Sequence, residues 1–201
     1  KTDIKKTTQK GQVLSLFVDK KELDASAHRY IDCVQCHPKP HDTPATPTKV
    51  TAADRCGSCH QYEKRLHRES IHGQSLIHGE EDAASCVDCH STTPSPHSVA
   101  RVLSPESPTY RRNIADTCNR CHGNEKLMTS YGILEKTYES YMRSYHGKVQ
   151  TLAKDDLRKL NMATCTNCHG VHDIKKAKDP SSKVGSVANQ KEACAQCHPG
   201  A

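Results

Sequence analysis

The chain has 201 residues, no Trp, one Phe and only 34% hydrophobic residues, with a mean hydropathy of −0.80 and a formal net charge of +6. So polar a chain cannot bury enough apolar side chains to offset the conformational entropy lost on folding, which excludes an ordinary hydrophobic core. The sequence contains no run of 18 or more apolar residues, which excludes a membrane-spanning helix.

Few secondary-structure elements are predicted in the first half of the chain. Residues 13–18 are the only candidate for a β-strand. The proline-rich residues 38–48 and 94–108 are predicted to form extended linkers. A short helix is expected after Cys56.

One longer helix is predicted over residues 125–147, because large apolar side chains recur there at alternating spacings of 4 and 3 residues. The positions are Leu127, Tyr131, Leu134, Tyr138, Tyr141 and Tyr145. The tyrosines are expected to pack against the interior rather than to catalyse a reaction. Short helices are also expected within residues 150–160 and around Cys194.

All 12 cysteines occur in six copies of one motif, Cys-x-x-Cys-His. The first cysteines are Cys33, Cys56, Cys86, Cys118, Cys165 and Cys194, and the second are Cys36, Cys59, Cys89, Cys121, Cys168 and Cys197. The histidines, here called proximal, are His37, His60, His90, His122, His169 and His198.

This motif is the attachment signature of haem c. Two thiols three positions apart bond to the two vinyl groups of one porphyrin, and the adjacent histidine ligates its iron. Disulfides would not require a histidine after every cysteine pair, and zinc half-sites would not require one at every copy. The sequence therefore predicts six covalently bound haem c groups.

Six haems would supply the apolar interior that the side chains do not. Each haem is shared by only about 33 residues, since 201 residues are divided among six. We therefore expect a mostly irregular and α-helical chain with short helices and little or no β-sheet, wrapped around a haem core. The two propionates of each haem add roughly −12 charges in all and bring the net charge to about −6, so the basic composition does not indicate nucleic-acid binding.

A repeat divides the single domain, residues 1–201, into three two-haem modules over about 26–60, 70–122 and 144–198. Each module begins with Ser-x-His, continues through a first Cys-x-x-Cys-His to a lone histidine, and ends with a second Cys-x-x-Cys-His. The Ser-x-His histidines are His28, His72 and His146, and the lone histidines are His41, His97 and His172.

These six additional histidines equal the haems in number, which predicts two histidine ligands for every iron. An iron with two protein ligands has no open position for a substrate, so it transfers electrons, and the absence of a recurring Met predicts low reduction potentials. His78 is an alternative to His72, and His67 is expected to be solvated. His41 and His172 follow a proximal histidine too closely to reach the opposite face of the same haem, so each is expected to ligate a neighbouring haem.

Residues 144–147 and 165–172 resemble segments of bacterial and archaeal multihaem cytochromes c, and the resemblance covers about residues 26–198. Members of that group carry electrons in the periplasm, form soluble heads of quinol-oxidising membrane complexes, or act at the cell surface, in some cases as filaments called cytochrome nanowires. Related reductases for nitrite, hydroxylamine or tetrathionate have a haem with an open face, often marked by Cys-x-x-Cys-Lys, which this sequence lacks. The resemblance implies an electron carrier rather than an enzyme, with redox proteins or extracellular acceptors as partners.

Haem attachment of this type takes place outside the cytoplasmic membrane, so we expect an exported protein of the periplasm or cell surface. Lys1 is interpreted as the end left by signal-peptide cleavage. The haem of His198 is expected to take its second ligand from upstream or from another copy of the chain, with His28 and His41 as candidate donors. Head-to-tail ligation of that kind would build a filament unless it closed into a ring.

Overall fold

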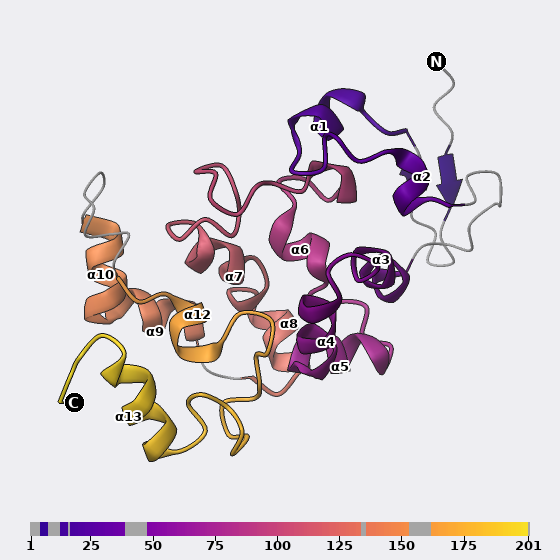
Figure 1. Ribbon diagram of the computed structural model, residues 1–201. Helices are drawn as coiled ribbons and strands as arrows, with labels where there is room; N and C mark the ends of the chain where they lie inside the picture. The colour runs from indigo at the N-terminus through magenta and orange to yellow at the C-terminus, as the bar shows by residue number, and fades with distance from the viewer. Residues whose placement is uncertain are drawn as a thin grey trace.

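The computed structural model describes residues 5–7, 13–15, 17–38, 48–133, 136–152 and 162–200. Most of the predicted linker over residues 38–48, including His41, lies outside these ranges, as do residues 153–160 of the helix expected over 150–160. Short helices and one small hairpin make up the regular structure of the described ranges (Figure 1). The mostly irregular, α-helical fold class is thereby confirmed.

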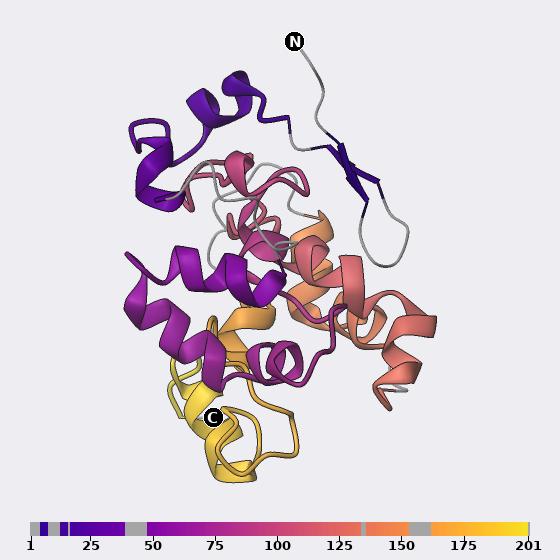
Figure 2. The same ribbon diagram turned by 90° about the vertical axis from the view of Figure 1, so that its right-hand side faces the viewer.

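The helices begin shortly before the first cysteine motif and continue to the last. They are α1 (Lys20–Ala25), α2 (Cys33–Cys36), α3 (Lys49–Cys56), α4 (Gln61–Glu69), α5 (Ile71–Ile77), α6 (Cys86–His90), η1 (Pro96–Ser98), α7 (Ile114–His122), α8 (Glu125–Ser130), α9 (Thr137–Arg143), α10 (Tyr145–Leu152), α12 (Cys165–His169) and α13 (Val187–Ala195). In both views α2 lies toward one end of the molecule and α13 toward the other (Figures 1 and 2).

The hairpin joins β1 (Lys5–Thr7) to β2 (Val13–Ser15) in antiparallel register, with Lys6 opposite Leu14. β2 falls within the only segment predicted to be a strand. Its partner β1 is a lysine-rich triplet without an alternating apolar pattern, so the sequence did not reveal it.

The prediction of one continuous helix over residues 125–147 was wrong. The chain forms α8, α9 and α10 there instead. Gly132 has a φ of 70°, which ends α8 because a left-handed residue cannot continue a right-handed helix. Ser144 is extended, and its hydroxyl accepts a hydrogen bond from the backbone N–H of Gly147 at 3.2 Å, so it ends α9 and caps α10.

Two glycines let consecutive helices cross closely. A Cβ on Gly73 of α5 would lie 1.9 Å from the carbonyl oxygen of His67 in α4, and one on Gly147 of α10 would lie 2.2 Å from that of Tyr141 in α9. Both glycines directly follow a Ser-x-His motif. The Ser-x-His-Gly sequence is therefore the crossing point of a helix pair in two of the three modules.

Apolar side chains contribute little to the interior. Among the described residues the buried hydrophobic side chains are Leu76, Ala83, Ala115 and Met128, whereas eight serines and threonines are buried. No helix within the described ranges is long and apolar enough to cross a membrane.

Candidate haem-binding sites

The first Cys-x-x-Cys-His of every module begins a helix. Its first cysteine is the first residue of α2, α6 or α12, and the residue before it caps that helix. The residue that precedes the second cysteine completes the cap by accepting a hydrogen bond from the backbone N–H of the capping residue. These reciprocal pairs are Asp32 with Gln35, Ser85 with Asp88, and Thr164 with Asn167.

The second Cys-x-x-Cys-His of every module lies at the end of a helix instead. Cys56 is the last residue of α3, His122 is the last residue of α7, and Cys194 lies in the last turn of α13. The helix expected around Cys194 is thus confirmed. The alternation of helix-starting and helix-ending motifs repeats three times along the chain.

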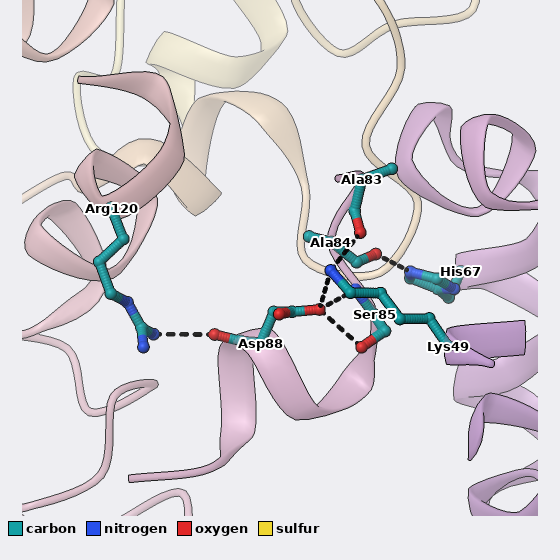
Figure 3. A network of polar contacts seen from close by, with 7 residues as sticks. All are labelled: Lys49, His67, Ala83, Ala84, Ser85, Asp88 and Arg120. Carbon is teal, nitrogen blue, oxygen red and sulfur yellow. Dashed lines mark hydrogen bonds and ion pairs between the residues drawn. The ribbon is translucent and has the colours of Figure 1, made fainter. Parts of the chain in front are cut away.

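A polar network fixes α6 against three other helices (Figure 3). Lys49 of α3 donates to the carbonyl oxygen of Ala83 at 2.9 Å and forms an ion pair with Asp88 at 3.0 Å. His67 of α4 and Arg120 of α7 donate to the carbonyl oxygens of Ala84 and Asp88 at 2.9 and 2.8 Å. The third cysteine motif is therefore held from α3, α4 and α7 at once.

We predict that Asp88→Ala lowers the free energy of unfolding of the haem-loaded protein by about 1 kcal/mol, the usual value of a helix cap. The variant loses the acceptor for the backbone N–H and the hydroxyl of Ser85, at 2.7 and 2.6 Å, as well as the ion pair with Lys49. Urea unfolding at pH 7 measures the loss. Asp24→Ala is the matched control, because Asp24 has only an exposed ion pair with Lys20 and should cost much less.

The loss of stability caused by Asp88→Ala should become smaller as the pH falls. Burial alone would raise the pKa of Asp88, but hydrogen bonds from Ser85 and Lys49 outweigh it and hold that pKa below its usual value. A lowered carboxyl pKa contributes stability that is present above about pH 4 and is lost as the pH falls through the folded-state value. The difference between wild type and Asp88→Ala should therefore shrink below pH 4, and a difference that grows there would contradict the assignment.

Five of the six proximal histidines face a second histidine ring. The ring centroids are 6.0 to 6.2 Å apart in every pair. The pairs are His37 with His97, His60 with His28, His90 with His172, His122 with His72, and His198 with His146.

These distances fit an iron held between two imidazoles. Two rings on opposite sides of one metal, each at a metal–nitrogen distance of about 2.0 Å, have centroids roughly 6 Å apart. All 12 cysteines lie within the described ranges and are free thiols, as thioether attachment requires. Arg111 and Arg112 each have a buried Nε without a hydrogen-bond partner, which suits the carboxylates of haem propionates. The residues present therefore fit haem c.

Burial lowers the pKa of several of the paired histidines and so favours the neutral form, which is the form that ligates a metal. It lowers the pKa of His72 to about 4, with the neighbouring His122 adding to the effect. Burial likewise lowers the pKa of His90, and His172 adds to it.

The Ser-x-His motif orients its histidine through the serine. Ser70 is buried, donates its hydroxyl to the carbonyl oxygen of His67 at 2.6 Å and accepts from the backbone N–H of Gly73 at 3.1 Å. Ser144 makes the same two contacts with Tyr141 and Gly147. The histidine then lies in the first turn of α5 or α10, where its ring meets the proximal histidine of the second motif.

The remaining histidines are His67, His78 and His169. His67 is half-buried and donates its Nε2–H to Ala84, so the expectation that it is solvated was wrong. His78 is exposed, and its Nδ1 contacts the carbonyl oxygen of Gln74 at 2.7 Å; the structure pairs His72, not His78, with a proximal ring. No described histidine ring is paired with His169.

The structure also bears on the expected ligand of the last haem. His146 of the same chain faces His198 at 6.2 Å, so this site does not require a ligand from another copy. His28, one of the two candidate donors, faces His60 of its own module at 6.1 Å.

Consecutive attachment sites are neighbours in space. From each site to the next, one thiol shifts the pKa of another through a hydrogen bond or through its charge, so the two thiols lie close together. The pairs that join one site to the next are Cys36–Cys56, Cys56–Cys86, Cys89–Cys121, Cys118–Cys165 and Cys168–Cys194. The six sites therefore follow one another in chain order.

The sequence profile of the class III cytochrome c family matches residues 2–107, which contain the first three cysteine motifs. The chain belongs to the class III cytochrome c family. Class III cytochromes are multihaem electron carriers with covalently bound haem c, and they are typically periplasmic. No curated protein and no solved structure matches this cytochrome. The last three motifs of this cytochrome follow the matched region and repeat its pattern.

Sequence reasoning missed several residues that position the sites of this cytochrome. Gln35, Asp88 and Asn167 close the helix caps inside the motifs, and Lys49 and Arg120 hold α6. A signal for the caps was present, since the first motif of every module has a side-chain carbonyl or carboxylate before its second cysteine. No local pattern marks Lys49 or Arg120, because their partners are distant in sequence.

Proposed function

We propose that this cytochrome carries electrons along a continuous line of six haems c, each held between two histidines, in the periplasm or outside the cell. The facing histidine rings at five sites carry the proposal, and the closeness of the attachment thiols of consecutive sites supports a continuous order of haems. When bound, each haem supplies an iron that accepts and releases one electron.

The chain's own residues would hold each iron and limit what it can do. At five sites two histidine rings face each other, so an iron held between them would have no position left for a substrate oxygen or nitrogen. The two cysteines of each motif would attach the porphyrin through two thioether bonds. An iron held in this way would transfer electrons rather than take part in bond-making chemistry.

The test combines a haem count with the spin state of the irons. Mass spectrometry of the intact protein should show six haems attached to one chain, and electron paramagnetic resonance should show low-spin ferric signals from the irons with two histidine ligands. A potentiometric titration should reduce all six reversibly. Fewer than six haems, or high-spin signals from most irons, would overturn the proposal.

A multihaem reductase is the second candidate, and one observation favours it. His169 is the proximal histidine without a described partner ring, so its haem is the one at which an open iron position could bind a small oxidised substrate. Reduction of nitrite, hydroxylamine or tetrathionate by the fully reduced protein, inhibited by carbon monoxide, would favour this candidate.

We also propose that copies of this cytochrome assemble head to tail into a filament, so that the line of haems continues between copies. The first and last sites lie toward opposite ends of the chain (Figures 1 and 2), which is the arrangement a head-to-tail contact needs. Electron microscopy of the native preparation distinguishes uniform fibres from compact particles of single-chain mass.

A further inference from the structure

Arg111 and Arg112 are adjacent cations whose inner nitrogens have no acceptor within the described ranges. The Nε of each side chain is buried and makes no hydrogen bond. No carboxylate of the described residues forms an ion pair with either guanidinium group. A buried donor on a charged group is costly to leave unpaired, so two such donors side by side indicate that an anion binds there.

The acidic side chains nearest to these arginines in sequence have other partners. Glu106 is exposed and accepts a hydrogen bond from the hydroxyl of Ser104. Asp116 accepts a hydrogen bond from the phenol of Tyr138 at 2.8 Å. Haem propionates are the anions that the attachment sites would bring into the interior, and a guanidinium group matches the geometry of a carboxylate.

Arg111 lies where the second and third modules meet, beside the fifth cysteine motif. It precedes α7 in the second module, yet its Nη2 donates to the carbonyl oxygen of Met162 in the third module at 2.9 Å. Met162 stands three residues before Cys165, the first residue of α12. Gln150 of α10 donates to the carbonyl oxygen of Arg112 at 2.7 Å and so holds the backbone of the arginine pair.

Tyr141 of α9 gives a second measure of where Arg111 lies. Its hydroxyl donates to the carbonyl oxygen of Ala163 at 3.1 Å, one residue after the contact made by Arg111. Burial raises the pKa of Tyr141 to about 12, with the Cys165 thiol adding to the rise and Arg111 opposing it. Arg111 and Cys165 therefore both lie close to this phenol, which places the arginine at the fifth attachment site.

We propose that Arg111 binds a propionate of the haem attached at Cys165 and Cys168, through the buried Nε–H that has no acceptor among the described residues. A reduced haem carries one positive charge less than an oxidised haem, so a cation fixed beside it favours the reduced state. Arg111 thereby raises the reduction potential of the fifth haem. Resting on the proposed six-haem line, this assignment makes a residue of the second module tune a haem of the third.

The experiment follows the reduction potential of each haem in the full-length, haem-loaded protein. Proton NMR during stepwise oxidation identifies the fifth haem by its contacts with residues 165–169. Arg111→Gln should keep six haems by mass and lower the potential of that haem, whereas Arg111→Lys keeps the positive charge and should lower it less. Arg143→Gln is the matched control, because it removes an exposed cation from α9 and should change no potential.

Tyr141→Phe separates the charge of Arg111 from its packing. It removes the hydrogen bond to Ala163 without changing any charge, so amide exchange at residues 162–165 should become faster while the fifth haem keeps its potential. The assignment would be overturned if Arg111→Gln left that potential unchanged or shifted another haem instead, or if Tyr141→Phe lowered it as far as Arg111→Gln does. Failure of the proposed function would look different, as fewer than six haems or a loss of reversible reduction in wild type.

Discussion

Produced without its haems, the chain should remain largely unfolded. Fixing the backbone of one residue costs roughly 1–2 kcal/mol, and burying one large apolar side chain returns about 1.5–3 kcal/mol. Within the described ranges only Leu76, Ala83, Ala115 and Met128 are buried hydrophobic side chains. The burial of these few side chains cannot offset the conformational entropy lost when a chain of 201 residues folds. We therefore expect the haems to supply the missing apolar contacts.

Expression in a cytoplasm without haem-attachment enzymes tests this expectation. Far-ultraviolet circular dichroism should show a mostly disordered chain, and amide hydrogen exchange should be fast throughout. The exported, haem-loaded chain is the control and should be helical and protected. A haem-free chain with native-like helix content and a cooperative melting transition would contradict the expectation that the haems form the core.

His172→Ala should open the third haem and loosen the contact between the second and third modules. His172 lies in the third module, and its ring is 6.0 Å from that of His90 in the second. The same segment docks on α5 through a hydrogen bond from the backbone N–H of Ile71 to the carbonyl oxygen of Ile174 at 2.7 Å. One haem in six should become high-spin, and the melting temperature should fall.

His78→Ala is the matched control, because it removes an exposed histidine whose hydrogen bond lies within its own helix end. Electron paramagnetic resonance and absorption spectra should show no change for this variant. Equal effects of the two substitutions, or a wholly low-spin His172→Ala, would contradict the pairing of His172 with His90. Hydrogen exchange at residues 165–175 reports the loss of docking independently of the spin state.

The haem sites were more predictable than the helices between them. The Cys-x-x-Cys-His motif is local, because covalent attachment requires two thiols and a histidine within five residues. A multihaem c-type cytochrome with short helices therefore followed from the cysteine pattern, and the family match and the structure agree with it. The partner of each additional histidine was not predictable, since His97 and His172 face motifs 60 and 82 residues away in sequence.

The prediction of one long helix was wrong because the periodic apolar residues are divided among three separate helices. Tyr131, Tyr138 and Tyr141 use their hydroxyls to contact Glu80, Asp116 and Gln150, so the stripe packs on different neighbours along its length. The turn at Gly132 and the cap at Ser144 interrupt the helix. The spacing of the apolar residues gives no information about either interruption. Local turn chemistry therefore outweighed the pattern.

The order of the histidine pairs has a consequence for how such chains can change in length. Each Ser-x-His histidine faces the second motif of its own module, and each paired lone histidine faces the first motif of the preceding module. Every junction between modules uses the same donor and the same acceptor, as His97 with His37 and His172 with His90 do. A DNA segment that encodes one module could thus be duplicated or deleted in frame without leaving an unmatched iron at any internal junction. The pairing makes the chain extensible in steps of two attachment sites.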